Sequence, residues 1–119
     1  MIKEIYIFTN GVLLSRRLIT DEAGTPITPE EISDVTLRLY ILQPNNGTYT
    51  RSLVDTQSLA PSDVITSSVQ TDPNGLQYNF RYCVESGFTS PNTLYLVEYT
   101  LTTVDEHKII VVAKGRTLD

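Results

Sequence analysis

Apolar residues recur at every second position over most of this chain, and that period constrains its fold more than any other feature. In residues 34–43, Val35, Leu37, Leu39 and Ile41 fall on one face of an extended strand. Comparable runs, bounded by turn-forming residues, occupy residues 4–7, 12–20, 48–55, 63–70, 76–85, 94–104 and 108–115. Strands without covering helices must bury their faces on one another. About eight strands therefore predict an all-β sandwich or barrel.

The segments between the runs carry the residues that tight turns require. "DPNG" at 72–75 has a proline with a fixed φ, then an asparagine, then a glycine that accepts the left-handed conformation. Asp72 can accept a hydrogen bond from the backbone two residues on. "PNNG" at 44–47 predicts the same turn between two other strands. We interpret both as folding devices, with a ligand site as the alternative.

Helix is confined to single turns. In "TPEEIS", residues 28–33, Thr28 can cap a turn, Pro29 suits its first position, and Glu31 can return the capping hydrogen bond. A second short turn is expected in "LAPSD", residues 59–63. Neither is long enough to cover the face of a sheet, so the sheets must cover each other.

The length of 119 residues suits one domain that buries its own core without metal or disulfide staples. We therefore predict a single β-sandwich domain over residues 1–119, with residues 115–119 as a C-terminal tail. Cys83 is the single cysteine, so no internal disulfide can form. It lies inside a predicted strand, where a small buried hydrophobe and a reactive thiol are the two interpretations.

The formal net charge is −5, with an isoelectric point near 4.7. That charge argues against non-specific binding to nucleic acid and against docking on an anionic membrane. No apolar run approaches the roughly 20 residues of a membrane-spanning helix. The first residues show no pattern of a secretory signal peptide. The protein either stays in the cytoplasm where it is made or has lost a leader, and Met1 favours the first option.

Few residues suit catalysis or metal binding. With one histidine, His107, and one cysteine, the chain cannot furnish a usual zinc site, and no nucleophile–base motif or phosphate loop occurs. We therefore predict no enzymatic activity, no cofactor and no metal site. Two binding alternatives stay open. Calcium could bind the loop carboxylates, and a glycan could stack on Tyr78, Phe80 and Tyr82. The loop carboxylates are Asp21, Glu22, Glu30, Glu31 and Asp34.

Several of the predicted strands are apolar on both faces. Leu39 and Ile41 point one way in the third run, so Tyr40 and Leu42 point the other way, and the last run is aliphatic on both faces. A second apolar face predicts a contact surface, unless loops cover it. The expected contact residues are Tyr40, Leu42, Ile110 and Val112.

The charges are unevenly distributed. Acidic residues fall mostly in loops, whereas most basic residues fall within strands. Bases on outward faces protect sheet edges from aggregation. The alternative interpretation is docking between copies, with the basic sheet of one against the acidic loops of the next.

Several motifs resemble those of a known group of domains. "DEAGTPIT" followed by "SDVTLRLYI", and later "DPNGLQYNFRY" followed by "NTLYLVEYTLTTVDEHKIIV", resemble the small immunoglobulin-like sandwiches of phage and prophage particle proteins. The resemblance spans roughly residues 18–112. The cysteine pair and tryptophan of antibody domains are absent. The resemblance implies an immunoglobulin-like antiparallel sandwich with a structural role in a virion and no catalysis.

The leading hypothesis is a non-enzymatic assembly protein of a phage particle, a capsid, connector, tail or baseplate component. Its partners would be copies of itself or another virion protein, and its location the virion after synthesis in the host cytoplasm. The alternative is a β-sandwich module that binds a glycan or a cell surface. Bound calcium could stabilise such a module.

Overall fold

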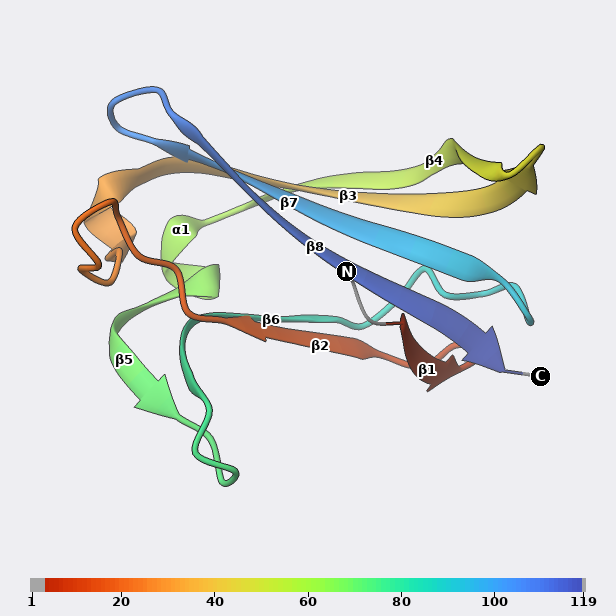
Figure 1. Ribbon diagram of the computed structural model, residues 1–119, viewed down its shortest axis with the longest axis horizontal. Helices are drawn as coiled ribbons and strands as arrows, with labels where there is room; N and C mark the ends of the chain where they lie inside the picture. The colour runs from red at the N-terminus through yellow and green to blue at the C-terminus, as the bar shows by residue number, and fades with distance from the viewer. Residues whose placement is uncertain (1–3, 119) are drawn as a thin grey trace.

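The computed structural model describes residues 4–118, which form eight strands and two single helical turns in two packed sheets (Figure 1). One sheet has five strands in the order β1-β8-β7-β3-β4, and the other has three in the order β2-β6-β5. The strands are β1 Glu4–Phe8, β2 Leu13–Arg17, β3 Ile32–Asn45, β4 Thr48–Leu59, β5 Ile65–Thr71, β6 Gln77–Val84, β7 Leu94–Thr103 and β8 Lys108–Leu118. The predicted all-β sandwich is confirmed.

The strand order is that of an immunoglobulin-like sandwich. In immunoglobulin lettering, the smaller sheet β2-β6-β5 has the order B-E-D. In the larger sheet, β8-β7-β3-β4 has the order G-F-C-C′. The hydroxyl of Tyr95, at the start of β7, accepts a hydrogen bond from the Ser90 backbone N–H at 3.1 Å, as in the tyrosine corner of such domains. The expected antiparallel pairing has one exception, because β1 runs parallel to β8.

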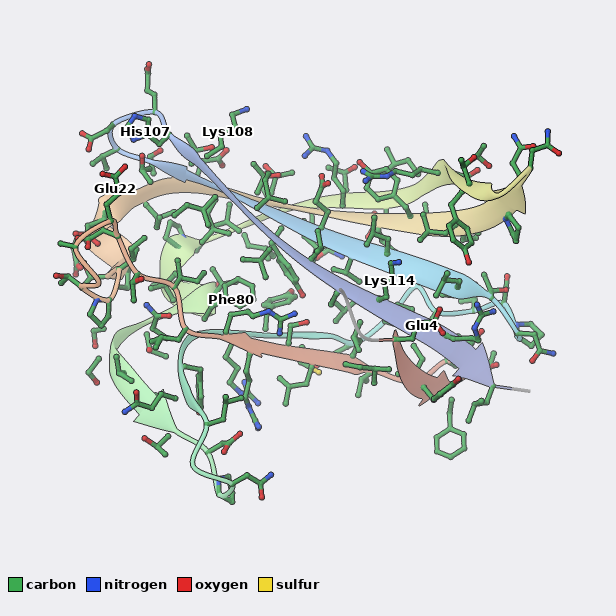
Figure 2. The ribbon with its side chains drawn as sticks, viewed as in Figure 1. Glu4, Glu22, Phe80, His107, Lys108 and Lys114 are labelled. Carbon is green, nitrogen blue, oxygen red and sulfur yellow. The ribbon has the colours of Figure 1, made fainter. Side chains whose placement is uncertain are left out.

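The core lies between the two sheets, where alternate residues meet. Val35, Leu37 and Leu39 of β3 are at most 1% exposed. Figure 2 shows Phe80 of β6 pointing between the sheets, and its ring meets Tyr99 of β7 edge to face at 4.9 Å. Each such side chain contributes about 1.5–3 kcal/mol when it is fully buried. The predicted inward face of β3 is therefore confirmed.

One turn geometry recurs in three of the loops. In "DPNG", the Gly75 N–H donates to the Asp72 carbonyl at 3.0 Å, and the Asp72 N–H donates to the Leu76 carbonyl at 2.9 Å. Oδ1 of Asp72 accepts hydrogen bonds from the backbone N–H groups of Asn74 and Leu76. Gly75 has a φ of 83°. The carboxylate thus closes the turn, as the sequence predicted.

The same geometry closes the turns that begin at Asp21 and Thr103, with Gly24 and Glu106 at the left-handed position. The prediction that "PNNG" repeats this turn is wrong. Asn45 pairs with Thr48, so 46–47 form a two-residue hairpin loop in which both residues have positive φ. Pro44 belongs to β3 and not to the loop, because a two-residue loop leaves no place for it.

Both predicted helical turns are present. The 3-10 turn η1 spans Pro29–Glu31, and Glu31 Oε2 accepts the Thr28 backbone N–H at 2.9 Å. The turn α1 spans Pro61–Val64 and begins with its proline. In residues 4–118, no helix has the length and apolar character that crossing a membrane requires.

The prediction of a tail at residues 115–119 is wrong for the part that the structure describes. Residues 115–118 belong to β8, where Gly115 pairs with Ile5 of β1 and with Tyr95 of β7. Asp119 lies outside the described residues. The polar composition of the segment does not indicate a strand. It forms one because it pairs with β1, which is distant in sequence, and with β7.

A buried asparagine holds the long loop between β2 and β3. Asn79 of β6 is 1% exposed, and its Oδ1 accepts the Ile19 N–H at 2.7 Å. Its Nδ2 donates to the carbonyls of Ile19 at 2.8 Å and Ile27 at 3.0 Å. Three hydrogen bonds from one side chain join the loop to the smaller sheet at two places, Ile19 and Ile27.

Candidate interaction surface

The four predicted contact residues all lie on the outer face of the five-stranded sheet, the face opposite the core. Alternation along β3 and β8 directs them outward, because their neighbours Leu39 and Val111 point into the core. The register places Leu42 beside Leu94 and Tyr40 beside Leu96 of β7. Ile110 and Val112 lie on the other side of β7, beside Thr100 and Glu98.

Most of these residues form an apolar cluster on that outer face, which we call the outer apolar cluster. Leu42 is 7% exposed, and Leu94 and Leu96 are each 4% exposed. Around them pack the half-buried side chains of Tyr40 and Val112. Leu94 and Leu96 were not among the predicted contact residues, although their alternation with Tyr95 and Val97 was a usable signal.

Ile110 differs from the other three predicted contact residues. It is 53% exposed and does not belong to the outer apolar cluster. Leu42 already packs inside the chain, whereas Ile110 has apolar surface that nothing in the described residues covers. The four side chains are therefore unequal. Ile110 can contact another protein without being needed for packing within the chain. Leu42 is already packed within the free chain.

Basic side chains surround the cluster, and we call Arg38, Arg51, Lys114 and Arg116 the basic rim. The Arg51 guanidinium lies 5.3 Å from the centre of the Tyr40 ring and pairs with Glu98 at 3.4 Å. Lys114 Nζ lies 5.9 Å from the centre of the Tyr49 ring. Arg116 pairs with Glu4 at 3.4 Å. In the described residues, no ion pair engages Arg38 or Lys114.

The outer face extends over β1, which adds two exposed aromatic residues. Tyr6 pairs in register with Arg116, so it shares that residue's face, and Phe8 follows two positions on. Their exposed fractions are 64% and 75%. The alternating run at residues 4–7 predicted a strand but no contact role for Tyr6 or Phe8. Nothing local shows that β1 lies at the edge of the larger sheet.

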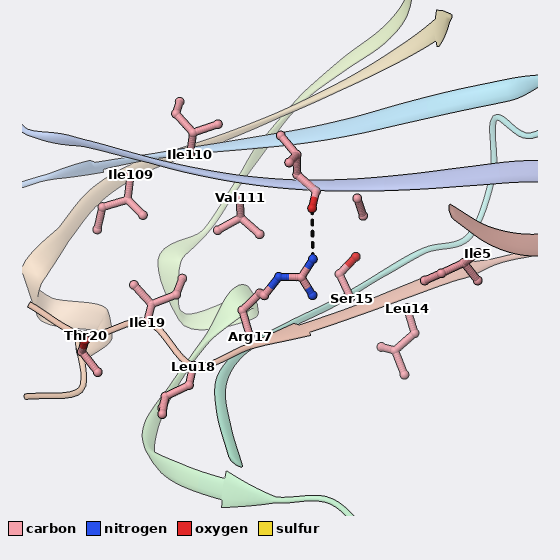
Figure 3. A pocket seen from close by; sticks show the side chains of 12 residues that line it. Ile5, Leu14, Ser15, Arg17, Leu18, Ile19, Thr20, Ile109, Ile110 and Val111 are labelled. Atoms are coloured by element: carbon pink, nitrogen blue, oxygen red, sulfur yellow. Dashed lines mark hydrogen bonds between the residues drawn. The ribbon is translucent and has the colours of Figure 1, made fainter. Parts of the chain in front are cut away.

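An open apolar groove of about 790 Å³ separates β8 from β2 at one edge of the sandwich (Figure 3). Its lining includes Leu14, Leu18, Ile109 and Ile110, and no strand pairs with residues 109–113 of β8 on this side in the described residues. Arg17 crosses the groove, and its Nη2 donates to the Val112 carbonyl at 3.1 Å. This bond satisfies one free acceptor of the strand edge.

The loop carboxylates do not form a metal-binding cluster. Asp21 Oδ1 accepts the backbone N–H groups of Ala23 and Thr25, and Glu31 accepts that of Thr28. Within residues 4–118, no group of three or more His, Cys, Asp or Glu residues is placed to hold a metal ion. The turn geometry therefore accounts for two of the carboxylates once considered for calcium.

Tyr78, Phe80 and Tyr82 do not form an exposed stacking platform. Phe80 is fully buried, and the ring of Tyr82 meets that of Tyr99 edge to face at 6.0 Å. Tyr78 is half-buried, with the Arg16 guanidinium 5.5 Å from its ring centre. Core packing uses two of the three rings and an arginine covers the third, so this surface offers no flat aromatic face to a sugar.

Cys83 lies in the smaller sheet, whereas His107 lies in the turn that joins β7 and β8 of the larger sheet. Cys83 is a partly exposed free thiol near the end of β6, and His107 is exposed in the turn before β8. The His107 backbone N–H donates to Thr103 Oγ1 at 3.0 Å, which closes the turn. No hydrogen bond joins the two side chains in the part of the chain that the structure describes. The two residues are not arranged as a nucleophile and its base.

A buried hydroxyl lies beside the core aromatic residues. Burial raises the pKa of Tyr99, and the nearby Ser15 hydroxyl opposes that shift only in part. Neither Tyr99 OH nor Ser15 Oγ has a partner in hydrogen-bonding geometry. Both side chains are buried, Tyr99 in the core between the sheets and Ser15 at the floor of the groove. We interpret them as part of the packing and not as a reactive pair.

A comparison with models of protein families finds no match, and neither do comparisons with curated proteins or with solved structures.

Proposed function

We propose that this chain is a non-enzymatic assembly protein, a structural component of a phage particle such as a capsid, connector, tail or baseplate protein. It acts through protein–protein contacts made by the outer face of the five-stranded sheet. In this proposal the chain is made in the host cytoplasm and resides in the virion. Its partners are copies of itself or another protein of the particle.

The main support for this proposal is the set of apolar side chains on the outer face of the five-stranded sheet, which take no part in the core between the sheets. A sandwich requires only one apolar face per sheet. Here the outer face has its own apolar cluster, with exposed apolar side chains at Tyr6, Phe8, Leu53 and Ile110 around it. Apolar surface gathered in this way marks contact with another protein. The resemblance of residues 18–112 to immunoglobulin-like domains of phage particles supports the virion as the setting.

The test is whether the chain is a stoichiometric component of purified particles. Particles from the source strain are banded on a density gradient, and the fractions are probed with an antibody raised against the purified chain. We expect the chain to sediment with the particles and to stay with them after a salt wash. A chain found only in the unsedimented fraction would rule out the structural role.

A pair of variants then locates the contact. Ile110→Ala should leave the melting temperature unchanged and reduce the amount of chain in the particle fraction, because Ile110 is exposed in the free chain. The matched control is Val12→Ala, another exposed aliphatic residue, which lies outside that face. Equal incorporation of both variants would show that the outer face is not the contact surface.

A further inference from the structure

The six carboxylates of three segments gather at one end of the sandwich, which we call the acidic end. The turn at 21–25, η1 and the turn at 103–107 meet there, and the Val104 N–H donates to the Glu31 carbonyl at 2.9 Å. A shared hollow at this end is lined by Asp21, Glu22, Glu31 and Asp105. The acidic end comprises Asp21, Glu22, Glu30, Glu31, Asp105 and Glu106.

An exposed apolar residue lies among these carboxylates. Val104 lines the same hollow as Glu31 and Asp105, and 59% of it is exposed. None of the six carboxylates forms an ion pair with a base in the described residues. The acidic end is thus an apolar projection among carboxylates that outnumber the basic side chains beside them, His107 and Lys108.

The outer face of the larger sheet has the complementary pattern. Its centre is the outer apolar cluster, and the basic rim surrounds it, with Arg38 and Lys114 outside any ion pair of the described residues. Figure 2 shows Glu22 and His107 at one end of the molecule and Lys114 well along β8 toward the other end. The acidic end and the centre of the outer face thus lie apart along the long axis of the molecule. Each can therefore contact a second molecule.

We propose, on the basis of the assembly role proposed above, that the acidic end of one copy docks on the outer face of the next. Val104 packs on the exposed apolar side chains around the outer apolar cluster, Leu53 and Ile110 among them, and the carboxylates of the acidic end face the basic rim. The contact is head-to-tail, because a symmetric contact of two outer faces would bring the two basic rims together. A head-to-tail contact repeats, so it builds a ring if the rotation closes and a filament if it does not.

The test uses two variants that each disable one half of the contact. Glu22→Lys combined with Asp105→Lys reverses two charges of the acidic end, and Lys114→Glu combined with Arg38→Glu reverses two charges of the basic rim. Two controls each carry one charge reversal of the same sign elsewhere, Glu85→Lys and Arg81→Glu, both at exposed sites of the smaller sheet or its loops. All variants are first checked for an unchanged fold by circular dichroism and melting.

Sedimentation velocity then measures association over a wide concentration range at low and high salt. We expect wild type and both controls to associate, with weakening at high salt, and each disabled variant to associate at least about tenfold more weakly. An equimolar mixture of the two disabled variants keeps one working acidic end and one working face. It should form a two-chain complex and nothing larger.

Three outcomes would overturn the head-to-tail contact. They are a wild-type chain that stays monomeric, an end-disabled variant that associates as well as its control, and a mixture that shows no more pairing than its components alone. Each outcome leaves the assembly role itself standing if the chain is found in particles, because another virion protein then covers the face. Absence from particles refutes the assembly role whatever the sedimentation shows.

Discussion

Removing the Asn79 side chain should weaken the whole fold, because one amide joins the long loop to the smaller sheet. In Asn79→Ala, the Ile19 N–H loses its acceptor, and the carbonyls of Ile19 and Ile27 lose a donor. The Ile19 carbonyl keeps the hydrogen bond from the Ile27 N–H at 3.1 Å. Three backbone groups therefore lose a hydrogen bond, and for two of them, the Ile19 N–H and the Ile27 carbonyl, no other bond replaces it.

The size of the effect follows from those bonds. A buried hydrogen bond contributes about 0.5–1.5 kcal/mol net, and a buried group left unpaired costs about 1–3 kcal/mol. We expect the free energy of unfolding to fall by roughly 2–4 kcal/mol, with a fall in the melting temperature of roughly 10 °C. Chemical denaturation gives the free energy, and amide hydrogen exchange at Ile19 gives the local effect.

The matched control is Asn74→Ala. Asn74 is exposed in a turn, where its backbone N–H and not its side chain makes the hydrogen bond to Asp72. That variant should stay within about 0.5 kcal/mol of wild type. If Asn79→Ala lost no more stability than this control, or if Ile19 stayed protected from exchange, the amide would not be what holds the loop.

Three further predictions concern other features. Glu106→Gly should raise the free energy of unfolding by about 0.5–1 kcal/mol, because Glu106 has a φ of 66° at the position that Gly24 and Gly75 hold in the two similar turns. An unchanged free energy of unfolding in a denaturant titration would contradict this backbone strain. Leu42→Ala should cost about 2–3 kcal/mol of stability and Ile110→Ala under about 0.5 kcal/mol, and equal losses would refute their unequal burial. Because the folded-state pKa of Tyr99 is raised, the unfolded state loses that proton first, so stability should fall as the pH rises above about 10, and less steeply in Tyr99→Phe. Equal slopes for the two proteins would show that another group is responsible.

Local chemistry explains the features that could be read directly from the residues. Side chains alternate across a strand whatever lies beside it, so the inward set of β3 and the outward position of Tyr40 and Leu42 were predictable. The turn at Asp72 and the cap of η1 depend on residues within five positions of each other. Such features need no knowledge of the rest of the chain.

Pairing and cover depend on residues far apart, and there the local pattern was insufficient. Residues 115–118 form a strand because β1 and β7 lie on either side of them. The hairpin at Asn46 took a different geometry from Asp72 because the register of β3 with β4 left it only two loop residues. Whether an outward residue is covered, as Leu42 is, or open, as Ile110 is, depends on which side chains neighbouring strands bring beside it. A strand's sequence shows which way each side chain points, but each of its edges can accept many partners, and the partners are chosen by the packing of the whole chain.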